Sequence, residues 1–239
     1  RHGKIHQRSA KGKPGVVTMA NPGSGAVATE LGRMLARELG LLYIDTGSMY
    51  RAVALAVMES SIRATDDVAV GSLAGRIDID LQGDPDSLRV TLGGVDVTDQ
   101  IRSEEVTHLS SVISTIPEVR RAMVARQREL GTRGAVLNGR DIGTVVFPDA
   151  DVKFFLTALP QARAERRFNE ERALDSQVDF EATFADMVER DRRDSTRVDS
   201  PLKAADDAIV VDSTGLSIAE VFQRMMVAVE RKSGGRPSS

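Results

Sequence analysis

The sequence predicts a three-layer α/β fold built around a five-stranded parallel sheet. Short apolar runs alternate with segments of helical periodicity, which is the pattern of parallel strands joined by crossover helices. One stretch with hairpin chemistry interrupts this alternation, and polar clusters follow the ends of three of the apolar runs. Because ligands bind beyond the carboxyl ends of parallel strands, these clusters predict a site at one edge of the sheet.

The first quarter of the chain alternates strand and helix twice. Val16–Met19 and Leu41–Ile44 are apolar runs of strand length. Between them, Thr29–Gly40 places leucines at helical spacing and stops at a glycine, and Ser48–Glu59 predicts a second helix. Strand–helix–strand–helix is the opening of a parallel sheet with right-handed crossovers.

Residues 63–102 break the pattern. Ile77–Leu81 and Leu88–Leu92 flank Gly83-Asp84-Pro85-Asp86-Ser87, whose turn chemistry predicts an antiparallel hairpin, and Val95–Val97 could add a third strand. We therefore expect a small inserted β subdomain, with the core domain formed by residues 16–62 and 103–231.

The second half of the chain returns to alternating elements. Its predicted helices are Ser103–Ser114, Pro117–Leu130, Pro160–Ala173 and Ser217–Arg231. Its predicted strands are Ala135–Leu137, Val152–Leu156 and Ala208–Val211, and a strongly charged segment spans Phe180–Arg197. We expect residues 1–15 to be a flexible basic leader and residues 232–239 a frayed tail.

Composition excludes several classes of function. The chain has no cysteine, which removes disulfides, thiolate catalysis and cysteine zinc sites, and only His108 lies in the body of the chain. The formal net charge of −3 argues against general nucleic-acid binding, and no apolar run reaches membrane-spanning length. We expect a cytoplasmic protein, monomeric, with no membrane or nucleic-acid partner. Lys153 and Lys203 are the only lysines between residues 16 and 230, so arginine supplies most of the positive charge, as suits contacts to phosphate.

The stretch after the first strand resembles a P-loop, in which a glycine loop and a helix N-terminus hold phosphate. It predicts an ATP-binding loop formed by Asn21, Pro22, Gly23, Ser24, Gly25, Ala26, Val27, Ala28 and Thr29. The P-loop pattern ends in Gly-Lys-Ser/Thr, and here Val27 or Ala28 stands in the place of the lysine. Thr29 could still offer a hydroxyl to Mg²⁺.

Three further motifs carry a family resemblance. They are Asp45-Thr46-Gly47-Ser48-Met49-Tyr50-Arg51, Gly139-Arg140-Asp141-Ile142-Gly143-Thr144-Val145-Val146-Phe147-Pro148-Asp149-Ala150 and Glu189-Arg190-Asp191-Arg192-Arg193-Asp194-Ser195-Thr196-Arg197. In this order and spacing the chain closely resembles the bacterial cytidylate kinases over roughly residues 16–230. The resemblance implies a P-loop-type kinase fold with a helical lid at 160–197 and a nucleotide-binding insert at 63–102. It also implies transfer of the γ-phosphoryl group of ATP, with Mg²⁺, to CMP or dCMP.

The resemblance also implies roles for single residues. Ser111, Arg120 and Asp141 match residues that read the cytosine edge. Asp45, Thr46, Arg51 and Arg140 match the surroundings of the monophosphate, and Arg190, Asp194 and Arg197 match lid residues that contact sugar and phosphates. We expect Arg140, Arg190, Asp194 and Arg197 to be the catalytic group. Plainer interpretations exist: Asp45 and Thr46 as a helix cap, Asp141 in a turn, and the 190–197 charges as a solvated helix face.

The chain departs from the family pattern at three positions. Besides the missing lysine, Ala20 or Asn21 stands where the family has an aspartate, and Asn138 stands where it usually has an acidic residue. Removing one preorganised electrostatic group typically costs about 10²–10³ in rate. Two hypotheses follow: a working cytidylate kinase with an altered loop or another cation, or a nucleotide-binding relative with little or no transfer. A nucleic-acid-binding factor that uses the basic leader is a third, more distant hypothesis.

Overall fold

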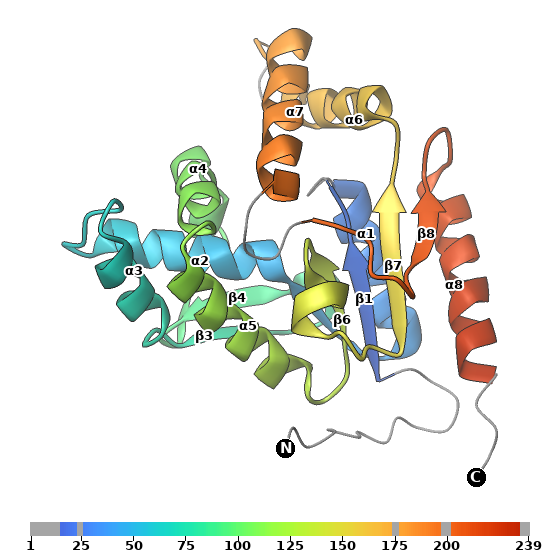
Figure 1. Ribbon diagram of the computed structural model, residues 1–239, viewed down its shortest axis with the longest axis horizontal. Coiled ribbons are helices and arrows are strands. Elements are labelled where there is room, and N and C mark those ends of the chain that lie inside the picture. The colour runs from blue at the N-terminus through green and yellow to red at the C-terminus, as the bar shows by residue number, and fades with distance from the viewer. Residues whose placement is uncertain (1–14, 23–25, 174–176, 197–201, 235–239) are drawn as a thin grey trace.

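A computed structural model describes residues 15–22, 26–173, 177–196 and 202–234 (Figure 1). The expected leader falls outside these residues apart from Gly15, as do Gly23, Ser24 and Gly25 of the glycine loop.

The central sheet has five parallel strands, as the sequence predicts. Its order is β2-β6-β1-β7-β8, so the first strand of the chain lies in the middle. The strands are β1 (Val16–Ala20), β2 (Leu42–Asp45), β6 (Ala135–Gly139), β7 (Val152–Thr157) and β8 (Ile209–Asp212). Their carboxyl ends therefore meet at one edge of the sheet, which confirms the predicted fold class.

Helices cover both faces of this sheet. On one face α1 (Ala26–Leu39) and α8 (Ile218–Gly234) pack on an apolar cluster that includes Tyr43 and Val136. On the other face α2 (Thr46–Glu59) and α5 (Pro117–Gly131) pack on a cluster that includes Ile44 and Leu137. Successive strand residues thus enter opposite cores, which is why most positions of these strands are apolar.

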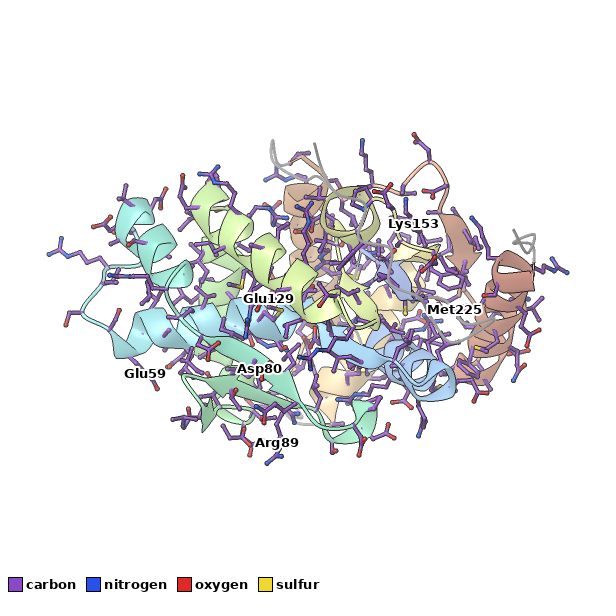
Figure 2. The ribbon with its side chains drawn as sticks, turned by 90° about the horizontal axis from the view of Figure 1, so that it is seen from below. Glu59, Asp80, Arg89, Glu129, Lys153 and Met225 are labelled. Carbon is purple, nitrogen blue, oxygen red and sulfur yellow. The ribbon has the colours of Figure 1, made fainter. Side chains whose placement is uncertain are left out.

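The insert forms a second, antiparallel sheet of three strands, β3 (Ile79–Gln82), β4 (Arg89–Leu92) and β5 (Val95–Asp96). Figure 2 shows this sheet from below, with Asp80 on β3 and Arg89 on β4. Its inward residues, among them Leu81 and Val90, belong to the same apolar cluster as Ile44 and Leu137. The insert also contains a helix that the sequence analysis did not predict, α3 (Asp67–Ala74), which packs on α5.

Three more helices surround the carboxyl edge of the sheet (Figure 1). They are α4 (Glu104–Ile113), α6 (Pro160–Arg172) and α7 (Phe180–Thr196). α6 and α7 pack on each other through Phe168 and Phe180, whose rings meet edge to face at 5.6 Å. Within the segment 160–197, the described residues are therefore mostly helical, and α6 and α7 lie beyond the strand ends.

Some predicted boundaries were wrong. α1 begins at Ala26 and not at Thr29, and α2 begins at Thr46 because the side chain of Asp45 caps it by accepting from the Gly47 amide at 3.0 Å. α8 runs to Gly234, so the first three residues of the expected tail at 232–239 are helical. A π-helical turn at Ile142–Val146, also not predicted, follows β6 directly.

Candidate functional site

Two neighbouring cavities open over the carboxyl ends of the strands. The first, of about 280 Å³, lies beneath α6 and is called the α6 cavity here. The second, of about 140 Å³, is lined by α2, α4, α5 and the end of β6 and is called the α4 cavity. Asn21, Arg51 and Thr107 line both. The two cavities therefore meet where β1 ends.

The α4 cavity contains three arginine–aspartate pairs. Arg51 Nη2 lies 3.1 Å from Asp45 Oδ2, and Arg140 Nε lies 2.9 Å from the Oδ2 of Asp194. Arg120 reaches across from α5 to Asp141, and their side chains are only 7% and 9% exposed. The carboxylates hold the guanidinium groups in place within the cavity.

Several N–H groups of these arginines are not used by the pairs. The Nε atoms of Arg51 and Arg120, and Nη2 of Arg140, are buried without a hydrogen-bond partner among the described residues. Nε and Nη1 of Arg163, at the α6 cavity, are likewise buried without a hydrogen-bond partner among the described residues. Buried donors are normally satisfied, and guanidinium groups match phosphate oxygens in geometry. The arrangement thus suits a ligand rich in acceptor oxygens.

The floor of the α4 cavity is formed by the ends of β2 and β6. Thr46 donates its hydroxyl hydrogen to the carbonyl of Asn138 at 2.9 Å, directly beside Gly139. A Cβ at Gly139 would lie 2.3 Å from Thr46 Oγ1 and 2.7 Å from Ile142, so a larger residue fits here only if these side chains shift. Thr46 is consequently fixed at the cavity floor by backbone geometry.

Two asparagines at neighbouring strand ends touch each other. Asn21 Nδ2 donates to Asn138 Oδ1 at 2.7 Å, and each residue is 4% exposed. Asn138 Nδ2 in turn donates to the hydroxyl of Tyr43 at 3.4 Å, and burial raises the pKa of this tyrosine, which keeps it neutral. The parallel register of β1 and β6 brings the two strand ends together. A neutral amide pair therefore lies at the carboxyl ends of β1 and β6.

Arg140 joins the sheet to the helical segment above it. Its Nη1 donates to the carbonyl of Asn21 at 2.9 Å while its Nε pairs with Asp194 on α7. Burial lowers the pKa of Arg140 below its ordinary value, and the carboxylates of Asp194 and Asp191 oppose this effect. The group stays cationic at neutral pH because a guanidinium starts from a very high pKa.

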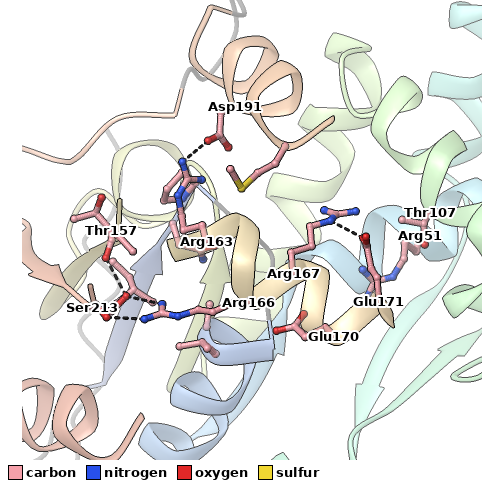
Figure 3. Close-up of a pocket in the computed structure, with 17 residues that line it drawn as sticks. Arg51, Thr107, Thr157, Arg163, Arg166, Arg167, Glu170, Glu171, Asp191 and Ser213 are labelled. Atoms are coloured by element: carbon pink, nitrogen blue, oxygen red, sulfur yellow. Dashed lines mark hydrogen bonds and ion pairs between the residues drawn. The ribbon is translucent and has the colours of Figure 1, made fainter. Parts of the chain in front are cut away.

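The α6 cavity combines an apolar floor with a basic wall (Figure 3). Val27 and Ala28, at the start of α1, line it together with three arginines of α6: Arg163, Arg166 and Arg167. Arg166 donates to Ser213 Oγ at 3.0 Å and to the Ser213 carbonyl at 2.6 Å, which ties α6 to the end of β8.

The structure brings most of the expected site residues together. All of the following line the α4 cavity: Asp45, Thr46, Arg51, Ser111, Arg120, Arg140, Asp141 and Asp194. Of the expected loop, Asn21, Pro22, Val27 and Ala28 line the α6 cavity, whereas Ala26 and Thr29 line neither. Arg197, the side chain of Arg190, and Gly23, Ser24 and Gly25 lie outside the described part of the chain.

Some residues that line the cavities were not predicted as site residues. They include the three arginines of α6 and polar residues of α4 such as Thr107 and Ser110. The sequence pattern could have indicated two of these arginines, since Arg163 and Arg167 are four residues apart in a predicted helix and therefore share a helix face.

Neither lysine of the chain's body takes the place of the missing one. Lys153, on β7, donates to the Pro148 carbonyl and lies 2.7 Å from Asp207 Oδ1, and it lines neither cavity (Figure 2). Lys203 is exposed and also lines neither cavity. The positive charge at the described parts of the two cavities comes from arginine.

The described residues contain neither a membrane-spanning helix nor a cluster of metal-ligating side chains. None of the helices in the described ranges has the length and apolar character needed to span a bilayer. Within the same ranges, no three His, Cys, Asp or Glu side chains cluster as they would around a metal ion.

Comparison with known proteins gives a consistent result. The family model described as "Cytidylate kinase" matches residues 19–231. A cytidylate kinase of Solibacter usitatus is 46% identical over 233 residues, which cover 96% of this chain and 98% of that protein. Cytidylate kinases of Geobacter sp. (strain M21) and Corynebacterium glutamicum are each 43% identical; their matches cover 91% and 90% of this chain and 94% and 95% of theirs.

A solved structure supports the fold only. An uncharacterized protein from Eubacterium ventriosum superposes with a TM-score of 0.52 at 8% identity, covering 92% of this chain and 99% of that one.

Proposed function

The chain belongs to the cytidylate kinase family, and on that premise we propose that it transfers the γ-phosphoryl group of ATP to CMP or dCMP. One observation supports this most: a cavity rich in arginine–aspartate pairs and a cavity at the start of α1 meet at Asn21 and Arg51. Phosphoryl transfer requires a donor and an acceptor held in line, with positive charge around the transferred group.

In this proposal the α4 cavity holds the nucleoside monophosphate. Asp141 accepts from the exocyclic amine of cytosine, which uracil lacks, while Arg120 and Ser111 complete the contacts to the base edge. An Asp141 that already bonds Arg120 is oriented for this task before the ligand arrives. The base is thus chosen by a buried hydrogen-bonding group, which discriminates strongly.

The phosphate of the monophosphate lies toward the sheet. Arg51 and Arg140 carry buried N–H groups there that have no partner among the described residues, and Thr46 and Asp45 fix the surrounding backbone. Asp45 then serves both as the cap of α2 and as the anchor of Arg51. Capping and ligand binding are compatible roles.

The α6 cavity takes ATP, with its phosphates at the start of α1. A helix N-terminus attracts anions through its free amides and its dipole, and residues 21–29 contain that terminus. Asp194 on α7 holds Arg140 at the junction of the cavities. From the family motif we assign Arg190 and Arg197 to the lid residues that contact the sugar and the phosphates.

Mg²⁺ accompanies ATP in this proposal. The residues at the junction fit a metal that is held mainly by nucleotide phosphates and water, because Asn21 and Asn138 present a neutral amide pair. When bound, the ion offsets phosphate charge. Thr29, the expected protein ligand, lines neither cavity. The expectations of a monomer and of a cytoplasmic location stay predictions.

A coupled assay of ADP formation with ATP and Mg²⁺ tests the function. We expect CMP and dCMP to be phosphorylated and UMP to be a much poorer acceptor. The variants Val27→Lys and Ala28→Lys, assayed beside the parent, separate an impaired kinase from a nucleotide-binding relative with little transfer. A parent as fast as both variants would refute the argument from the missing lysine.

Calorimetry with CMP alone tests the acceptor site separately. Absence of CMP binding, together with no CMP-dependent ADP formation in the parent and both lysine variants, would overturn the proposed function.

A further inference from the structure

A π-helical turn follows Asp141, the residue assigned above to the exocyclic amine of the base. This turn, Ile142–Val146, is called the π turn here. The Asp141 carbonyl accepts hydrogen bonds from three amides of the π turn: those of Thr144 at 3.3 Å, Val145 at 2.9 Å and Val146 at 3.4 Å. Turns of this kind are rare and are often found at functional sites. The backbone of Asp141 is therefore coupled directly to the position of the π turn.

The far end of the π turn is held by Arg128 of α5. Arg128 Nε donates to the Val146 carbonyl at 2.9 Å, and its Nη2 donates to the Val145 carbonyl at 2.7 Å. The last carbonyls of a helical segment have no partner within it, and a basic side chain beside them both satisfies them and complements their dipole. One planar guanidinium thus caps two adjacent carbonyls, whereas a lysine would offer a single point charge.

Two more contacts hold the same segment on α5. At one end Arg120 pairs with the side chain of Asp141. At the other end Phe147 packs so closely on Gly131 that a Cβ there would lie 2.5 Å from the ring. Arg128 lies between Arg120 and Gly131 in the sequence of α5. The segment from Asp141 to Phe147 is therefore attached to α5 at both ends, and Arg128 holds the turn between them.

We propose, resting on the function proposed above, that Arg128 is a positioning residue for base recognition. It holds the π turn on α5, the amides of the turn hold the Asp141 carbonyl, and the carboxylate of Asp141 is thereby aimed at the exocyclic amine of cytosine. Arg128 lines neither cavity, so it acts through the turn and not by touching the ligand. A hydrogen bond weakens steeply as its angle departs from linearity, so a loosened turn costs affinity for cytosine in particular.

The first test measures the nucleotide affinity of the full chain by calorimetry, with CMP and UMP as separate ligands. We expect Arg128→Ala to weaken CMP binding about fivefold, the size of one typical hydrogen bond. UMP binding should be unchanged, because uracil has no amine for Asp141 to accept from. Arg128→Lys should restore part of the loss, since it keeps the charge and can cap one carbonyl. A purely structural role would weaken the binding of both nucleotides alike.

Arg126→Ala is the matched control on the same helix. Arg126 Nε likewise donates to a backbone carbonyl, that of Ile79 at 2.7 Å. Its ion pairs are with Asp78 and Glu129, so these contacts lie outside the π turn. We expect Arg126→Ala to bind CMP as tightly as the parent. Circular dichroism confirms that each variant is folded.

A second test measures the π turn itself by amide hydrogen exchange. Amides exchange faster where their hydrogen bonds open locally. We expect peptides that cover residues 139–147 to exchange faster in Arg128→Ala than in the parent, and the same peptides to exchange alike in Arg126→Ala and the parent. This measurement requires neither ligand nor turnover.

The outcomes separate this proposal from the proposed function. The proposal is overturned if Arg128→Ala binds CMP as tightly as the parent, if it loses CMP and UMP affinity equally, or if Arg126→Ala loses as much CMP affinity. Unchanged exchange over residues 139–147 in Arg128→Ala overturns it as well. If Arg128→Ala weakens CMP binding selectively while no enzyme form phosphorylates CMP, the proposal holds and the assignment of phosphoryl transfer fails. A parent that does not bind CMP overturns both.

Discussion

Asp141→Asn tests the buried pair at the base of the α4 cavity. Asp141 and Arg120 are less than a tenth exposed, so the substitution leaves a guanidinium buried without its counter-charge. Its remaining neighbours are the Ser114 carbonyl at 3.3 Å and the Tyr50 ring at 6.0 Å. Burial opposes the charged form of Arg120, but Tyr50 and Asp194, which remain in the variant, raise its pKa, and a guanidinium starts from a very high pKa, so it does not escape by losing a proton.

The size of the effect follows from this geometry. Two unit charges about 4 Å apart attract by about 4 kcal/mol at an effective dielectric constant of about 20. Removing one partner of a buried pair typically costs about 3–5 kcal/mol of unfolding free energy. Because the asparagine oxygen can still accept from Arg120, we expect the lower end, about 3 kcal/mol.

Urea unfolding followed by circular dichroism measures this loss. Asp86→Asn is the matched control, since its pair with Arg37 at 2.8 Å joins side chains that are 54% and 55% exposed. An exposed pair of this kind is worth about 0–1 kcal/mol. Equal unfolding free energies for Asp141→Asn and the parent, or equal losses in the two variants, would refute the reasoning from burial.

Two further outcomes are expected. Gly139→Ala should weaken CMP binding in calorimetry, because its Cβ would displace the hydroxyl of Thr46 from the cavity floor; unchanged affinity would show that Thr46 does not position the ligand. The hydrogen bond from Lys153 lowers the pKa of Asp207. The ionised carboxylate therefore stabilises the fold fully above its unfolded pKa of about 3.9, and this stabilisation is lost as the pH falls through the lower pKa of the folded state. The stability gap between the parent and Asp207→Asn should therefore shrink below about pH 4 in urea unfolding; a gap that is the same at pH 3 and pH 7 would contradict this.

The strands and the edge at which the site lies could be predicted because they depend on local pattern. A parallel strand buried on both faces is mostly apolar, and the polar residues that follow it in the sequence must lie at the carboxyl edge of the sheet. Asn21, Asp45 and Arg140 were found in this way. Arg120 and Ser111 were not visible in the pattern of their own helices, and the family motif alone indicated them.

What the sequence could not predict depends on contacts between distant segments. The amide pair of Asn21 and Asn138 results from the register of two strands that are more than a hundred residues apart. The basic wall of the α6 cavity exists because Arg166 ties α6 to the last strand. α3 was missed because it has only eight residues and contains Gly71, which packs so closely on Glu118 that a Cβ would lie 2.4 Å from that side chain.

The two cavities differ in how their walls are attached. The insert shares one apolar cluster with the central sheet, whereas none of the described residues of α6 and α7 belongs to either cluster. The described side chains of α6 and α7 are joined to the strand edge by polar contacts, such as those of Arg166 with Ser213 and of Asp194 with Arg140. Attachment by charge weakens as ionic strength rises, while apolar attachment does not. We therefore expect higher ionic strength to loosen the attachment of α6 and α7 more than that of the insert.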